Sequence, residues 1–233
     1  MGRPETEKEV ATDWAGRHLR IANSSYDEVI RRFIPNYGEM ISRAATEVAR
    51  VRPRLVTDLG SGTGSLAEAL LAEEGVGAVE LVDSDDSMLD RAEERLARFG
   101  DRVRLSCRDF NDPPQESDAF CASLALHHIA DLEDKRAFYR NIFVNTPEGG
   151  VFVNADIALS SSEDENRRIR HLWVEHMVSA GIHREQVFRH FEEWAEEDTY
   201  FTLDEELDAI GRAGFRAECV WRIGMSAICV GRK

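Results

Sequence analysis

The sequence lacks any long hydrophobic run. None of its apolar stretches approaches the roughly 20 residues that a membrane-spanning helix needs. The segment Met1–Glu5 leads into charged residues rather than an apolar core, so we expect no secretory signal. Both absences favour a cytoplasmic protein that does not act on a membrane. With 233 residues, 42% of them hydrophobic, the chain is long enough to bury the core of one large domain.

Cysteine is scarce, and the histidines are not spaced as metal ligands on a helix usually are. The four cysteines form no C-x-x-C pair, which favours reduced thiols over a disulfide framework or a zinc site. No two of the seven histidines have the i, i+4 spacing that places two rings on one helix face. The sequence therefore predicts no metal site. The cysteines are Cys107, Cys121, Cys219 and Cys229.

Basic residues are outnumbered. The chain has 29 Lys and Arg against 44 Asp and Glu, which gives a formal net charge of −15. A protein that follows a phosphate backbone usually carries a basic face. We therefore expect neither nucleic acid nor an anionic membrane as a partner, and we interpret the acidity as an aid to solubility.

Short apolar runs alternate with amphipathic stretches over the first two thirds of the chain. Residues 27–50 predict two helical pieces broken near Pro35. The alternation that follows implies right-handed βαβ units and a parallel sheet with helices on both faces. The expected strands are 54–58, 78–83, 103–107, 118–123 and 151–155, and the expected helices are 65–74, 86–99 and 131–145.

The pattern changes after Asp156. Two amphipathic helices are predicted without a strand between them, and a capping box at Thr202–Glu205 predicts a third helix. The last two apolar runs predict an antiparallel pair of strands, because only a short turn near Gly224 joins them. The expected helices are 162–180, 184–197 and 202–212, and the expected strands are 215–221 and 225–230.

These patterns divide the chain into four parts. We expect an N-terminal helical cap (1–50), a ligand-binding core (51–156), a helical insertion (157–200) and a C-terminal part (201–233) that completes the core. The insertion interrupts the sheet protein and is a candidate lid or substrate cap.

The strongest motif is the run Asp58-Leu59-Gly60-Ser61-Gly62-Thr63-Gly64, which follows the first expected strand and opens a helix. Glycines let a ligand lie against bare backbone, and the exposed amides at a helix start suit an anionic or polar group. The GxGxG spacing differs from the GxGxxG of dinucleotide enzymes and from the GxxxxGK[ST] of phosphate-binding loops. A tight turn without a ligand remains the alternative.

Two further signals follow the next two strands. Asp83 ends the second strand 19 residues after Gly64, where a carboxylate can accept both hydroxyls of a ribose. Its alternative role is to cap the next helix. Asp109 follows the third strand and could accept from an exocyclic amine, while Phe110 or Met88 could pack on an adenine face.

Five segments together resemble the class I S-adenosylmethionine-dependent methyltransferases. They are Asp58–Gly64, Val82-Asp83-Ser84 with Met88-Leu89, Arg108-Asp109-Phe110, Ser123–Ile129 and Pro147–Gly150. The resemblance covers about residues 52–156, and the antiparallel tail is similar to the reversed final strand of that family. It implies S-adenosylmethionine as the cofactor and an α/β fold. That fold is a Rossmann-like, doubly wound sheet of seven strands, mostly parallel with a reversed C-terminal strand, plus a helical insertion after strand five.

The motifs and the resemblance together imply a set of cofactor contacts in the core. These are Asp58, Gly60, Ser61, Gly62, Gly64, Asp83, Ser84, Met88, Asp109, Phe110 and Ser123.

A narrower resemblance concerns the carboxy-S-adenosylmethionine synthase branch. The segments Phe33–Tyr37 and Trp221–Ser226 are similar to that branch, in which a tyrosine before the first strand reaches the cofactor. Tyr37 falls on that position. The branch also uses an arginine after strand five to bind its carboxylated product, but Phe191 stands where this arginine aligns, with Arg189 nearby. The departure favours ordinary methyl transfer.

Three residues are candidates for catalysis. Methyl transfer is an in-line displacement at a sulfonium carbon, so the enzyme mainly positions the nucleophile and excludes water. His127 and His128 follow the fourth strand, where the methyl group should point, and a neutral imidazole there accepts a proton. Asp156 follows the fifth strand and is the third candidate. The alternatives are histidines that only shape the pocket and an aspartate that caps a helix.

The expected function is methyl transfer to a small-molecule acceptor. A non-catalytic binder of S-adenosylmethionine or its product, or a carboxy-S-adenosylmethionine synthase-like enzyme, is the alternative. A nicotinamide-dependent dehydrogenase is disfavoured, because the glycine spacing differs and no Tyr-x-x-x-Lys occurs. The insertion has an apolar face that could form core, an acceptor pocket or a homodimer contact. Its members are Trp173, Met177, Phe188, Phe191 and Trp194.

Overall fold

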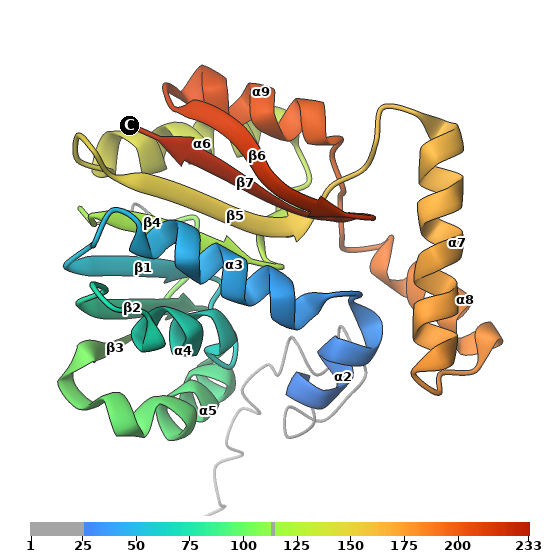
Figure 1. Ribbon diagram of the computed structural model, residues 1–233, viewed down its shortest axis with the longest axis horizontal. Helices are drawn as coiled ribbons and strands as arrows, with labels where there is room; N and C mark the ends of the chain where they lie inside the picture. Colours follow the sequence, from blue (N-terminus) through green and yellow to red (C-terminus); the bar gives the residue numbers. More distant parts are fainter. Residues whose placement is uncertain (1–25, 113–114) are drawn as a thin grey trace, which may run out of the picture.

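The computed structural model describes residues 26–112 and 115–233. These residues form one sheet of seven strands in the order β3-β2-β1-β4-β5-β7-β6, with helices on both faces (Figure 1). The predicted Rossmann-like α/β fold is confirmed. Residues 1–25 of the predicted N-terminal cap lie outside the described residues, and the four-part division stays a prediction.

The strands are β1 (Leu55–Leu59), β2 (Ala78–Asp83), β3 (Val103–Cys107), β4 (Ala119–Ser123), β5 (Val151–Ile157), β6 (Arg216–Ile223) and β7 (Ser226–Arg232). The α-helices are α2 (Tyr26–Phe33), α3 (Tyr37–Ala49), α4 (Ser65–Ala72), α5 (Asp86–Leu96), α6 (Leu132–Asn145), α7 (Glu163–Ser179), α8 (Arg184–Trp194) and α9 (Leu203–Ala213). Two 3₁₀ segments, η2 (Ala97–Arg102) and η3 (Leu126–His128), complete the described elements.

The central strands are largely buried because helices cover both faces of the sheet. All seven residues of β5 are buried, and β1, β2, β3, β4 and β5 pair in parallel. Only β7 is reversed among the described strands: it lies between β5 and β6 and pairs antiparallel with both. The turn that reverses it contains Gly224 at φ 62, a conformation that favours glycine. This arrangement confirms the predicted reversed C-terminal strand.

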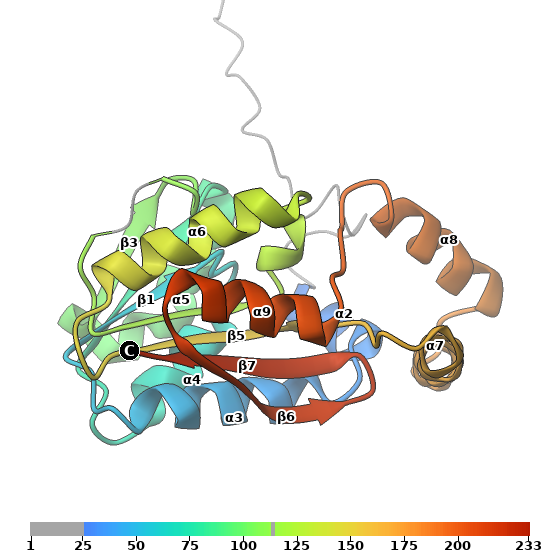
Figure 2. The same ribbon diagram turned by 90° about the horizontal axis from the view of Figure 1, so that it is seen from above.

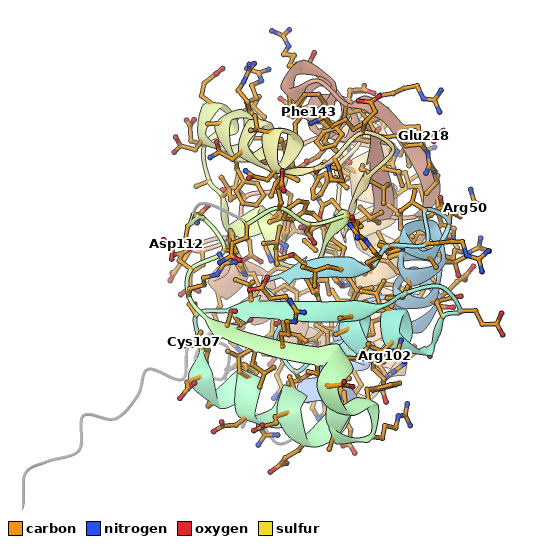
Figure 3. The ribbon with its side chains drawn as sticks, turned by 90° about the vertical axis from the view of Figure 1, so that its left-hand side faces the viewer. Arg50, Arg102, Cys107, Asp112, Phe143 and Glu218 are labelled. Carbon is orange, nitrogen blue, oxygen red and sulfur yellow. The ribbon has the colours of Figure 1, made fainter. Side chains whose placement is uncertain are left out.

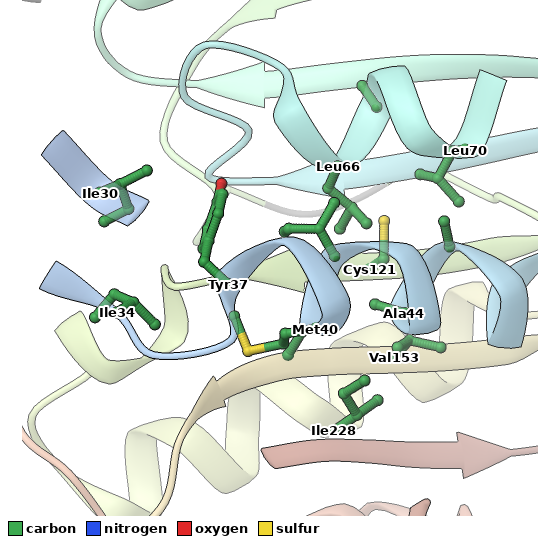
Figure 4. Packing of buried hydrophobic residues seen from close by; sticks show 14 of the residues in the cluster. Ile30, Ile34, Tyr37, Met40, Ala44, Leu66, Leu70, Cys121, Val153 and Ile228 are labelled. Atoms are coloured by element: carbon green, nitrogen blue, oxygen red, sulfur yellow. The ribbon is translucent and has the colours of Figure 1, made fainter. Parts of the chain in front are cut away.

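Each face of the sheet has its own hydrophobic cluster. One cluster lies under α3, α4 and α5, where Met40 and Ala44 of α3 pack near Val153 of β5 and Ile228 of β7 (Figure 4). The other lies under α6 and α9 and includes Phe152. The two layers therefore hold the strands rigidly, so that the loops at the strand ends have fixed positions.

The helical insertion lies beyond the carboxyl ends of the parallel strands, next to α2 (Figures 1 and 2). The indole Nε1 of Trp173 on α7 donates to the carbonyl oxygen of Phe33 on α2 at 2.5 Å. The Phe33 ring also meets the Trp194 ring of α8, with centroids 5.3 Å apart. These contacts make α2, α7 and α8 one packed unit over that edge of the sheet. Figure 3 shows the molecule from the opposite end of the sheet, with Arg50 and Glu218 labelled at the edge of that view.

Two predicted helices end three residues earlier than expected. The helix predicted to end at Phe99 leaves the α conformation after Leu96 and continues as η2, in which Gly100 has φ 57. The helix predicted over 184–197 ends at Trp194, whose carbonyl then accepts from the amides of Glu197 and Asp198 in a turn. Within the described part of the chain, no helix combines the length and the apolar character that crossing a membrane requires.

Candidate active site

A cavity opens beyond the carboxyl ends of the parallel strands. Its empty volume, including space that opens to solvent, is about 950 Å³. A smaller polar pocket of about 380 Å³ adjoins it, and both are lined by Gly60, Gly62 and Leu124. In an open parallel sheet, ligands bind at this edge. The two pockets therefore form one continuous site around the glycine-rich run.

The glycines of that run have different tasks. Gly60 has φ 64, and a Cβ there would lie 2.5 Å from the Cβ of Ala125, so only glycine fits. A Cβ at Gly62 would meet nothing within 4 Å, which leaves bare backbone open to a ligand. Gly64 lines neither pocket: it precedes α4 and faces Ala92, Leu96 and Leu81. Gly60 and Gly62 thus line the pockets and Gly64 packs against neighbouring side chains, and the cofactor contacts of all three stay predictions.

Asp83 points at the glycine-rich run, as predicted. Its Oδ2 accepts from the amide of Gly62 at 2.7 Å and its Oδ1 from the amide of Asp85 at 2.9 Å. Burial raises the pKa of Asp83, and the hydrogen bonds from these amides oppose that shift. The alternative role as helix cap belongs to Asp85, whose carboxylate accepts from the amide of Ser87 at the start of α5. Asp83 lines the larger cavity with Ser84, Met88 and Phe110.

The other acidic candidate, Asp109, is placed differently. It is exposed, and its Oδ1 accepts from the amide and the side-chain nitrogen of Asn111 at 2.8 and 2.9 Å. It lines neither pocket. Its neighbour Phe110 does line the cavity and packs edge-on against Phe138. The contact of Asp109 with an exocyclic amine stays a prediction.

The smaller pocket is polar and has hydrogen-bonding groups to spare. Among the described residues, Asp58 Oδ2, Ser61 Oγ and Ser123 Oγ are buried without a hydrogen-bond partner. Burial, reinforced by the negative charge of Asp83, raises the pKa of Asp58 to about 7. Tyr37 points its hydroxyl from α3 towards the loop before α4 (Figure 4), and burial raises its pKa. Such a pocket fits an amino-acid group, which carries both donors and acceptors.

Helix α2 is tied to the same loop. The carboxylate of Asp27 accepts from the hydroxyls of Thr63 and Ser65 at 2.9 and 3.1 Å, and it pairs with Arg95 of α5. Helix α2 also lines the larger cavity through Ile30 and Phe33, and Ile34 follows directly after it. The helix therefore contributes a wall to the cavity while it is anchored at the glycine-rich loop.

The three catalytic candidates meet at the far end of the cavity. His127 Nδ1 lies 2.7 Å from Asp156 Oδ1, and the His127 amide donates to Asp156 Oδ2 at 3.1 Å. A carboxylate only accepts, so His127 Nδ1 donates and, in the neutral ring, Nε2 keeps its lone pair. Burial lowers the pKa of His127, but the charges of Asp156 and then Asp198 outweigh it and the pKa is raised. The pKa of Asp156 is lowered despite burial, chiefly by His127.

Sequence reasoning missed Asp198 and Tyr200, which share this end of the cavity. Asp198 Oδ1 lies 3.2 Å from His128 Nδ1 and 3.7 Å from His127 Nε2, and Tyr200 donates to Asp198 Oδ2 at 2.5 Å. Both follow α8, about seventy residues after the histidines. Their local sequence is an ordinary acidic turn, so only the packing of the insertion against the η3 loop brings them here.

The apolar stripe of the insertion splits between two uses. Trp173 and Trp194 line the cavity, whereas Met177 and Phe191 are buried in the core and Phe188 is 46% exposed. Arg189, beside the position where the carboxy-S-adenosylmethionine synthase arginine aligns, is exposed, and no Arg or Lys lines the described cavity.

Comparison with known proteins agrees with this geometry. Residues 56–150 match the family described as "Methyltransferase domain". A malonyl-[acyl-carrier protein] O-methyltransferase of Halorhodospira halophila is 33% identical over 142 residues, which are 59% of this chain and 45% of that protein. A carboxy-S-adenosyl-L-methionine synthase of Campylobacter lari is 20% identical over 196 residues, 83% of each chain. The chain spans about half the length of the first of these relatives.

The fold comparison gives the same result. The human N-acetylserotonin methyltransferase, solved in complex with SAM, superposes with a TM-score of 0.63 at 18% identity, over 96% of this chain and 59% of that one. The likeness at this identity shows the fold alone. The matched family, with the methyltransferase relatives and a neighbour solved with S-adenosylmethionine, indicates this molecule as the cofactor. Residues 56–150 of this chain are thus similar to the family described as "Methyltransferase domain".

Proposed function

We propose that this protein transfers a methyl group from S-adenosylmethionine to a small-molecule acceptor. The observation that carries the proposal is the joined pair of pockets: a polar one with unpartnered buried oxygens, and a mostly apolar one that ends at His127 and His128. The bound cofactor supplies a methyl group on a positively charged sulfur, which is already a good leaving group. The protein then has to align the acceptor and exclude water.

The cofactor half uses the residues around the glycine-rich run. We assign the ribose hydroxyls to Asp83 and the adenine to the space between Met88 and Phe110, with Ser84 at its rim. The amino-acid group belongs in the polar pocket, where Asp58, Ser61 and Ser123 have acceptor or donor capacity to spare. Tyr37 closes that pocket. The sulfur then lies near Gly60 and Gly62, the backbone that both pockets share.

The acceptor half uses the helices beyond the sheet. Ile30 and Phe33 of α2, with Trp173 and Trp194 of the insertion, make its walls apolar. A small, largely apolar molecule with one nucleophilic oxygen or nitrogen matches these walls, since the polar groups of this half gather at one end. The net charge of −15 argues against a nucleic-acid acceptor.

Proton removal is the task of the histidine end. We propose that Asp156 fixes the His127 ring so that Nε2 faces the cavity, and that His127 and His128 bind and deprotonate the nucleophile. A base helps only an acceptor that carries a proton to be lost. Asp156 acts as a positioning residue, because it contacts His127 rather than the cavity.

A carboxy-S-adenosylmethionine synthase-like activity is the second candidate, because that relative aligns over 83% of the chain. The cavity weighs against it. A carboxylated cofactor would add a negative charge near the described lining, which has Asp83, Asp85 and Asp198 but no Arg or Lys. Mass spectrometry of the small molecules that co-purify with the native protein separates the two: the carboxylated cofactor would favour the second candidate.

Calorimetry with S-adenosylmethionine tests the base of the proposal. We expect one binding site per chain, and failure of a folded sample to bind at millimolar cofactor would refute it. Variants that remove a carboxylate from the site also change the net charge. Asp90→Asn, which removes an exposed carboxylate on α5, is the control for that change. Formation of S-adenosylhomocysteine with a panel of small phenols, amines and carboxylic acids then tests transfer. A protein that binds but never turns over with any of them would be the non-catalytic binder.

A further inference from the structure

Three metal-binding atoms converge at the acceptor end of the cavity. One potential ligand atom from each of His127, His128 and Asp198 lies within 4.8 Å of the other two. His128 Nδ1 and His127 Nε2 are 3.2 and 3.7 Å from the same carboxylate oxygen. In a tetrahedral zinc site with bonds of about 2.0–2.1 Å, neighbouring ligand atoms lie about 3.3 Å apart. The two measured distances lie on either side of that value.

Orientation of the rings supports a cation between these atoms. Since His127 Nδ1 donates to Asp156, the neutral ring turns the lone pair of Nε2 towards Asp198. A lone pair facing a carboxylate oxygen is unfavourable unless a proton or a metal cation lies between them. The pairing of a ligand histidine with a carboxylate on its other nitrogen is the usual outer shell of a zinc site. Tyr200, which donates to the second oxygen of Asp198, completes that outer shell.

The charge of the cluster points the same way. The side chains of Asp156 and Asp198 are 6% and 3% exposed, so two carboxylates are buried together. Among the described residues, the positive charges that act on Asp156 are those of His127 and, less strongly, Lys135, which already pairs with Glu206. A nearby positive charge stabilises buried carboxylates. A divalent ion would neutralise both carboxylates at once.

We propose that His127, His128 and Asp198 bind one divalent zinc-type cation, with its open coordination position facing the acceptor cavity. Three protein ligands and one open position are the arrangement of catalytic rather than structural zinc sites. Sequence spacing predicted no metal site because the ligands come from two loops, η3 and the segment after α8, instead of one helix.

The consequence for catalysis rests on the proposed function. With the cation bound, His127 is a ligand and no longer accepts the acceptor's proton itself. The oxygen or nitrogen of the acceptor occupies the open position, and the cation lowers its pKa so that its proton leaves to solvent. The methyl–sulfur bond then breaks as the bond from that atom to the methyl carbon forms, and the sulfur keeps the electron pair.

Metal binding by the full chain tests the proposal without any acceptor. After dialysis against a chelator, the protein is titrated with Zn²⁺ in competition with a chromophoric chelator, and with Co²⁺ followed by visible absorption. We expect one ion per chain, a sub-micromolar Kd for Zn²⁺, and the strong visible bands of tetrahedral Co²⁺ without a thiolate charge-transfer band. Asp198→Asn and His128→Gln should each weaken Zn²⁺ binding at least 100-fold. His171→Gln, an exposed histidine on α7, should leave it unchanged.

Several outcomes would overturn the proposal. One is binding of less than one-tenth of an ion per chain. Another is an unchanged Zn²⁺ affinity in a folded Asp198→Asn variant, with its fold checked by far-ultraviolet circular dichroism. The third is a Co²⁺ spectrum that shows thiolate ligands. A cluster that holds a shared proton instead of a metal gives the first of these. S-adenosylmethionine binding measured on the metal-free protein separates the two proposals. Zinc binding without cofactor binding would keep the metal site and refute the proposed function.

Discussion

Replacement of Asp58 by Asn should make the protein more stable, increasingly so as the pH rises. Asp58 is 1% exposed, and burial raises its pKa to about 7 from an ordinary value of 3.8. Between these values the folded protein holds a proton that the unfolded chain has lost, so the free energy of unfolding falls as the pH rises. Three pKa units at about 1.36 kcal/mol each amount to a penalty of about 4 kcal/mol, fully present above pH 7.

Urea unfolding of wild type and Asp58→Asn at pH 5, 6, 7 and 8 measures this effect. The difference in unfolding free energy should widen by about 3 kcal/mol over this range in favour of the variant, because most of the titration window lies within it. Asp109→Asn, at an exposed carboxylate, controls for the loss of one negative charge. A difference that stays constant from pH 5 to pH 8 would refute the assignment of a buried, neutralised Asp58.

The same titration should appear in cofactor binding. The ammonium and sulfonium groups of S-adenosylmethionine favour the ionised form of Asp58. Affinity should therefore rise with pH up to about 7 in the wild type, by up to tenfold per unit, and flatten in Asp58→Asn. Calorimetry at matched ionic strength gives both curves. If the affinity of wild type and of Asp58→Asn changed with pH in the same way, the amino-acid group of S-adenosylmethionine would not bind next to Asp58.

Three further substitutions test other parts of the site. Asp83→Ala should weaken S-adenosylmethionine binding about 100-fold in calorimetry, because two hydrogen bonds to a charged group are lost; equal affinity would remove the ribose assignment. Gly60→Ala places a Cβ 2.5 Å from that of Ala125 and should lower both the melting temperature and the cofactor affinity. Gly149→Ala, also at positive φ but with nothing within 4 Å, should cost only the backbone strain of about 1 kcal/mol. Asp27→Ala should speed cofactor release in stopped-flow experiments and raise hydrogen exchange in α2; unchanged rates would show that this carboxylate does not anchor the helix.

The sheet was predictable because its signals are local. The strand predicted over 151–155 is apolar except for Asn154, and β5 differs from it only by two extra residues that β7 pairs with. The reversal of β7 follows from a turn too short for a crossover. The end of α8 at Trp194 was not predictable from the sequence, because no glycine or proline follows Trp194 closely.

The sequence signals for the proposed cofactor half of the site are also local. Those for the acceptor half are not, because its residues come from distant parts of the chain. Gly60 directly follows β1 and Asp83 ends β2, so the pairing of these parallel strands brings them to the same edge of the sheet. Asp109 also follows its strand closely, but its Oδ1 accepts from Asn111 and it lines neither pocket, so its contact with the cofactor stays a prediction. Asp198 could not be found at all, because its distance from His128 depends on how the insertion packs.

The division of labour between the elements around the cavity has a further consequence. The residues assigned to the cofactor lie between Tyr37 and Ser123, whereas the tryptophans, Asp198 and Tyr200 of the acceptor half all follow β5. Mutations in the segment after β5 can therefore change which acceptor binds while the binding of S-adenosylmethionine stays the same. A chimera that exchanges residues 158–201 with those of a relative should keep its donor affinity and adopt a new acceptor, which makes this segment the natural unit for engineering.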